Sequence, residues 1–151
     1  MRNTLSLGGM NAMRKTVFAL LLCFAVQLEA RLVEAPPTAG QLRDWATGSC
    51  VRAGRSAGID YLRSLDRAVA LDPAGLGTLL RFTDSGWCDG GAGEGHCAIL
   101  FGLLQHWGDQ PFARVLRAQK KPVRKAVFNE LASFPSFKRT EFPLTYASGP
   151  H

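Results

Sequence analysis

Apolar residues in this chain recur mostly at spacings of three and four, and stretches that alternate apolar with polar residues are almost absent. The first spacing places side chains on one helical face, whereas alternation is typical of a half-buried strand. The first predicted helix begins at Thr38, in a capping-box sequence with Gln41, and ends near Gly54. Its apolar face consists of Leu42, Trp45, Ala46 and Cys50.

Two further helices are predicted before the middle of the chain. The first spans residues 57–71 and carries one apolar face. The next begins at Asp72 and Pro73, where an N-cap residue precedes the residue type favoured in a first helical turn. The apolar positions are Ile59, Leu62, Leu65 and Val69 in the first helix and Leu76, Leu79 and Leu80 in the second.

The fourth predicted helix carries the strongest apolar pattern. Its main face consists of Cys97, Leu100, Phe101, Leu104 and Trp107, with Ala98, Ile99 and Leu103 beside it. A helix that is apolar on nearly every side is buried, so this segment is expected at the centre of the core. The glycine-rich residues 85–95 precede it and are expected to form a loop or a loosely started helix.

Two more helices and an irregular tail complete the predicted fold. The fifth helix follows Gly108 and Asp109, and the sixth begins at Lys121 and Pro122. Their apolar positions are Phe112, Val115 and Leu116, and Val123, Ala126, Val127 and Leu131, respectively. Residues 134–151 contain three prolines and no periodicity, and Phe137, Phe142 and Tyr146 are expected to attach this tail to the helices. The sequence therefore predicts an all-α fold, in which residues 38–133 form one domain of about six helices, each of roughly 10–16 residues.

The amino terminus has the pattern of a secretory signal peptide. From Met13 the chain has two basic residues, then 11 residues (16–26) that are almost all apolar, and a small residue at Ala30. The run is shorter than the about 20 residues that span a bilayer. We expect cleavage after Ala30, an extended leader over residues 31–37, and a periplasmic or secreted protein. A buried N-terminal helix is the alternative.

Composition and charge narrow the class of protein. The chain has 151 residues, of which 46% are apolar and 20% charged, so a disordered tail, a collagen-like fibre and a multi-pass membrane protein are excluded. The net charge is +6, and it falls to +4 once residues 1–30, with three basic residues and one acidic residue, are removed. This charge favours acidic partners without requiring nucleic acid.

Six basic residues lie between Asp109 and Glu130, in a stretch without any acidic residue. They are Arg114, Arg117, Lys120, Lys121, Arg124 and Lys125. The turn between the fifth and sixth helices falls among them, so they should converge at one end of the molecule. They are either a solvated helical face or a docking patch for an acidic protein surface, an anionic lipid or an anionic wall polymer.

Three cysteines remain after residue 30. Cys88 and Cys97 flank glycine-rich residues that can bend, so in an oxidising compartment we expect a disulfide between them. Cys50 is then a buried apolar thiol, and its pairing with Cys88 or Cys97 is the alternative. Cys23 would leave with the signal peptide.

The same glycine-rich segment holds the residue types of several active sites. Ser85 or Cys88 with Asp89 and His96 would supply a nucleophilic triad, and Asp89 with Glu94 would supply two carboxylates for glycosidic cleavage. No strand–turn–helix elbow surrounds them, and the Cys88–Cys97 spacing fits no zinc pattern. We therefore predict no catalytic residue, metal or cofactor, and keep a small cell-envelope hydrolase as the alternative.

Residues 42–50 resemble the first mature helix of small periplasmic immunity proteins that neutralise type VI secretion amidases. The shared features are Leu42, the aromatic Trp45 followed by Ala46, and Cys50. Residues 122–131 resemble the second helix of a HEAT-type pair. The first resemblance implies an exported, all-helical protein that binds its partner without catalysis. The glycine-rich segment departs from that family, so no functional residue is carried over. The leading prediction is an exported protein-binding module of immunity or adaptor type.

Overall fold

The computed structural model describes residues 35–46, 48–88 and 90–149. The predicted signal peptide lies outside the described residues. Of the predicted leader, residues 35–37 are described and are not helical. The unit described below begins at Pro36.

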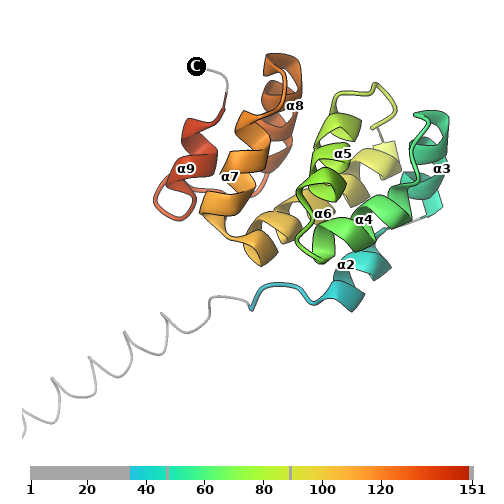
Figure 1. Ribbon diagram of the computed structural model, residues 1–151, viewed down its shortest axis with the longest axis horizontal. Coiled ribbons are helices and arrows are strands. Elements are labelled where there is room, and N and C mark those ends of the chain that lie inside the picture. Colours follow the sequence, from blue (N-terminus) through green and yellow to red (C-terminus); the bar gives the residue numbers. More distant parts are fainter. Residues whose placement is uncertain (1–34, 47, 89, 150–151) are drawn as a thin grey trace, which may run out of the picture. The chain divides into compact units, whose positions relative to one another are not determined.

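Helices account for all the regular secondary structure of the described residues, which contain no strand. The helices are α2 (Ala39–Trp45), α3 (Gly48–Ser56), α4 (Tyr61–Val69), α5 (Pro73–Thr83), α6 (Gly90–Trp107), α7 (Asp109–Arg117), α8 (Lys121–Leu131) and α9 (Pro143–Ala147) (Figure 1). The predicted all-α class is confirmed. No described helix combines the length and the apolar character that crossing a bilayer requires.

The helix boundaries differ from the predicted ones in three places. The first predicted helix is divided into α2 and α3, because Ala46 adopts a ψ of 74° that leaves the helical path. The second begins at Tyr61, where the Asp60 side chain caps it by accepting a hydrogen bond from the Arg63 amide (3.1 Å). The central helix starts inside the glycine-rich segment at Gly90, where its first turns meet α3: the Cys50 thiol donates to the Ala92 carbonyl.

Helix α6 forms the centre of the core, as its all-round apolar pattern predicts. Ile99, Leu100, Leu103 and Leu104 are fully buried, and α6 contacts every other helix from α2 to α8. Gly102 allows α2 to pack closely against α6, because a Cβ there would lie 2.5 Å from Leu42 Cδ2 in α2. The C-terminal turn of α6 also holds α4, since the Trp107 indole donates to the Ala68 carbonyl (2.8 Å).

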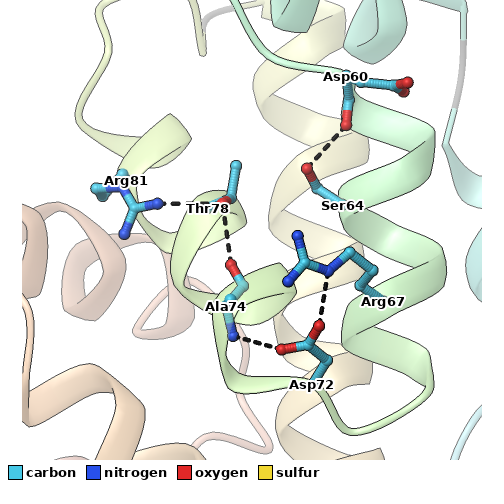
Figure 2. A network of polar contacts seen from close by, with 7 residues as sticks. All are labelled: Asp60, Ser64, Arg67, Asp72, Ala74, Thr78 and Arg81. Carbon is cyan, nitrogen blue, oxygen red and sulfur yellow. Dashed lines mark hydrogen bonds and ion pairs between the residues drawn. The ribbon is translucent and has the colours of Figure 1, made fainter.

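Helices α4 and α5 form a tight hairpin (Figure 1). A Cβ on Gly75 would lie 2.7 Å from the Ala68 nitrogen and 2.8 Å from the Ser64 oxygen, so glycine is needed at this contact. At the turn, the Asp72 carboxylate accepts hydrogen bonds from the Ala74 amide (2.8 Å) and from Arg67 Nε (2.6 Å) (Figure 2). These two bonds, that of Arg67 first, lower the pKa of Asp72.

The predicted tail is attached to the helices and is partly helical. Phe137 and Tyr146 pack against Phe128 of α8, with ring centroids 5.7 and 5.2 Å from it, as the aromatic pattern predicts. The absence of a helix in the tail was predicted wrongly, since α9 forms there. The Asp109 carboxylate accepts hydrogen bonds from the amides of Leu144 (2.8 Å) and Thr145 (2.7 Å), and this satisfies the N-terminal turn of α9.

Replacing Gly75 with alanine is expected to destabilise the protein by about 1–3 kcal/mol, because the new methyl group must separate two helices whose backbones touch. Urea unfolding at neutral pH measures this change. Gly40→Ala is the matched control: its Cβ would come no nearer than 3.9 Å to a neighbouring atom, so helix propensity alone should leave stability equal or slightly higher. Equal stability of the two variants would contradict the close contact at Gly75.

Candidate functional site

The six basic residues predicted as a docking patch lie on α7, α8 and the turn between them. Helix α7 buries Phe112, Ala113, Val115 and Leu116, and α8 buries Val123, Val127 and Leu131. These apolar faces leave the intervening cations outside. Helix α7 ends at Arg117, and Lys120 with an extended backbone begins α8. The turn is therefore short and brings the cations of both helices together.

None of these six cations has an ion pair within the described residues. The two ion pairs found there, Arg43–Asp66 and Arg67–Asp72, involve α2, α4 and the α4–α5 turn. Five of the six side chains are exposed, and Arg124 is half-buried. The Arg124 Nε atom is buried and has no hydrogen-bond partner among the described residues. The charges are thus available to an external anion.

Helix α5 adds a seventh cation, which the sequence analysis missed. A Cβ on Gly77 would lie 3.4 Å from both Arg81 Nη1 and Gln119 Nε2, so the Arg81 guanidinium lies beside the α7–α8 turn. A hydrogen bond from Arg81 Nη2 to Thr78 Oγ1 (3.1 Å) orients it (Figure 2). Its sequence position, more than 30 residues from Arg114, gives no indication of this proximity. We call Arg81 and the six cations of α7, α8 and their turn the basic surface.

The predicted disulfide between Cys88 and Cys97 is absent from the structure. The Cys97 thiol lies 3.3 Å from the Glu130 carbonyl and 3.3 Å from Ser133 Oγ, at the C-terminal end of α8. Burial raises the pKa of the Cys97 thiol to about 11. Cys97 is one of the buried positions of α6, so its side chain is directed to α8 and not back over the glycine-rich segment.

His96 lies in a buried hydrogen-bond network with Tyr61 and Thr83. The Tyr61 hydroxyl is 2.7 Å from His96 Nδ1, and Thr83 Oγ1 is 3.0 Å from His96 Nε2. Thr83 donates its own proton to the Leu79 carbonyl (3.4 Å), so it accepts from Nε2–H, and Tyr61 donates to Nδ1. Both ring nitrogens of a neutral imidazole are thereby satisfied.

Burial determines the protonation states of His96 and Tyr61. Desolvation lowers the pKa of His96 to about 3. Desolvation, followed by the nearby Cys50 and Cys88 thiols, raises the pKa of the Tyr61 hydroxyl. Both groups therefore stay neutral at physiological pH. The Phe82 ring packs edge-on against both rings, with centroids 5.3 Å from Tyr61 and 4.9 Å from His96, which completes an apolar enclosure.

The predicted catalytic candidates differ in their exposure to solvent. His96 has no exposed surface, whereas Glu94 is exposed on the same helix two positions earlier. Asp89 lies outside the described residues. The described chain also contains no group of three or more metal-ligating side chains. His96 is therefore suited to holding α4, α5 and α6 together and has no access to a polymeric substrate.

Comparison with known proteins gives no relative for this chain. No family model, curated protein or solved structure matches it. The resemblance of residues 42–50 to immunity proteins thus stays a prediction. A partner can reach the basic surface, whereas the hydrogen bonds of Tyr61, His96 and Thr83 are buried.

The free energy of unfolding is expected to fall by about 2 kcal/mol between pH 7 and pH 5. Unfolded histidine binds a proton near pH 6.5, whereas folded His96 does so only near pH 3, so acid favours the unfolded state over this interval. The lowered pKa of Asp72 acts only below its ordinary value of about 4. Urea titrations at several pH values measure the slope.

The matched control for this pH dependence is His106→Gln. The imidazole of His106, on the same helix, is half-buried, and its Nε2 lies 3.0 Å from the Val69 carbonyl. This variant should keep the wild-type slope, whereas His96→Gln should lose it, whatever its absolute stability. Equal stability of the wild-type protein at pH 5 and pH 7 would contradict a buried, neutral His96.

Proposed function

We propose that this chain is an exported, non-catalytic helical module that binds an acidic surface of a partner protein through the basic surface. The observation that carries the proposal is the convergence of seven cations from three helices with no ion pair among the described residues. The exported location rests on the predicted signal peptide. An immunity or adaptor role agrees with the resemblance of the first helix.

Repulsion among the cations of the basic surface lowers the stability of α8. Lys120 and Lys121 stand at the N-terminal end of α8, where the helix dipole already concentrates positive charge. Lys121 and Lys125 are four residues apart on one helix, a like-charge spacing that costs about 0.2–0.5 kcal/mol. An ordinary solvated face mixes both signs of charge. An acidic partner would relieve this repulsion, which supports a binding role.

An acidic protein fits the surface better than a membrane does. Four of its seven cations are arginines, whose planar guanidinium groups pair with carboxylates through two parallel hydrogen bonds. Peripheral membrane helices combine basic residues with inserted apolar side chains. The large apolar side chains exposed on the described residues, namely Trp45, Leu71, Trp87 and Leu144, all lie outside the basic surface.

Neutralising three exposed lysines is expected to weaken binding of an acidic polypeptide about tenfold. The variant combines Lys120→Gln, Lys121→Gln and Lys125→Gln, and poly-L-glutamate is the probe in calorimetric titrations. Each lost charge contact is worth roughly 0.5 kcal/mol, so the three together amount to about 1.5 kcal/mol, and about 1.4 kcal/mol corresponds to a tenfold change in affinity. Binding by the wild-type protein should weaken as added salt shortens the Debye length. The thermal stability of the variant should stay equal or rise.

The control removes the same charge elsewhere, through Arg52→Gln, Arg55→Gln and Arg63→Gln on α3 and α4. These arginines are exposed and take no part in the two ion pairs. This variant should bind poly-L-glutamate as the wild-type protein does. Equal weakening in both variants would reduce the effect to net charge and overturn the assignment of the site. Tighter binding to vesicles of an anionic phospholipid than to poly-L-glutamate would overturn the choice of a protein partner.

A further inference from the structure

Two cysteines lie beside the first turns of α6. The Cys50 thiol, in α3, lies 3.4 Å from the Ala92 carbonyl. The Cys88 carbonyl lies over the neighbouring residue, because a Cβ on Gly93 would be 3.3 Å from its oxygen. Cys50 and Cys88 therefore flank two consecutive residues of the same helix, although 38 positions separate them in the chain.

The buried Tyr61 hydroxyl provides a second link between the two thiols. Besides burial, both the Cys50 and the Cys88 thiols raise the pKa of Tyr61. The Cys88 side chain also packs against the core cluster that contains Cys50 and Tyr61. Cys97 is not part of this group, since its sulfur contacts Ser133 and the Glu130 carbonyl at the C-terminal end of α8.

A glycine with positive φ lies on either side of Cys88. Gly86 and Gly90 flank it with φ values of 74° and 48°, and a Cβ at either position would meet no atom within 4 Å. Cys88 is half-buried, so a reagent in solution can reach it, whereas Cys50 is fully buried. This combination suits a pair in which one thiol reacts first and the other completes the bond.

We infer that Cys50 and Cys88 are a redox pair that closes a disulfide between α3 and the entry to α6. The oxidant is a disulfide compound, such as oxidised glutathione. The Cys88 thiolate attacks one of its sulfur atoms, which forms a mixed disulfide and releases one thiol. The Cys50 thiolate then attacks the Cys88 sulfur and releases the second thiol. The protein loses two electrons and two protons, and the oxidant becomes two thiols.

The bond would secure the glycine-rich start of α6 without touching the basic surface. It would close the chain from residue 50 to residue 88 and so restrict the unfolded state. It would also sit beside the Tyr61–His96 hydrogen bond, in the part of the core where α3, α4 and α6 meet. This inference is independent of the proposed binding function, because the basic surface is formed by α5, α7, α8 and the turn between the last two.

Peptide mapping of the full chain after incubation with oxidised glutathione tests the pairing. No lysine or arginine lies between Arg81 and Arg114, so trypsin alone leaves Cys88 and Cys97 in one peptide. A second protease that cleaves after Glu94 separates them. We expect peptide 44–52, which carries Cys50, to be linked to peptide 82–94, with the joint mass lower by two hydrogen atoms, and peptide 95–114 to carry an alkylatable Cys97.

Thermal unfolding provides the second measurement. Oxidation should raise the midpoint of the wild-type protein by roughly 5–10 °C, reversibly with a reductant, and should do the same for Cys97→Ser. Oxidation should leave the midpoint of Cys88→Ser unchanged. Because Cys88 is half-buried, this variant should fold even if Cys50→Ala, at a fully buried position, does not. A bond between peptides 82–94 and 95–114, or a stable glutathione adduct on Cys88 without closure, would overturn the inference.

Discussion

Burial of α6 on nearly all sides is the constraint that organises this protein. The helix has no polar face to turn toward water, so the other helices must surround it. Glycine makes this enclosure tight: Gly102 brings the backbone of α6 against Leu42, and Gly75 brings α5 against α4. One consequence is that charged residues are displaced to the outer faces of the surrounding helices. The basic surface is formed where α5, α7 and α8 present such outer faces together.

Patterns within one helix predicted much of the fold, whereas contacts between helices could not be predicted. The apolar periodicity identified α6 and α8, and the Asp72–Pro73 start of α5 was evident because an N-cap acts on neighbouring residues. The division between α2 and α3 was missed, because it depends on a backbone rotation at Ala46 that no residue pattern there indicates. Helix α9 was missed because its N-terminal amides are satisfied by Asp109, about 35 residues earlier.

The same distinction applies to the candidate site. Six cations of the basic surface lie within one short stretch and were predicted, but Arg81 joins them only through the packing of α5 against the α7–α8 turn. His96 stood in the sequence among catalytic residue types, yet its partners come from Tyr61 and Thr83 on two other helices. Cys97 likewise faces α8 and not Cys88, a direction that depends on which side of α6 that helix occupies.

The Asp109 carboxylate links the C-terminal helix α9 to α7. It lies at the first residue of α7 and holds the backbone of α9, while Arg114 and Arg117 lie further along the same helix. The last described helix is therefore joined to the helix that carries two arginines of the basic surface. Loss of the Asp109 carboxylate would thus release α9 from the helix of Arg114 and Arg117, although α9 itself lies outside the basic surface.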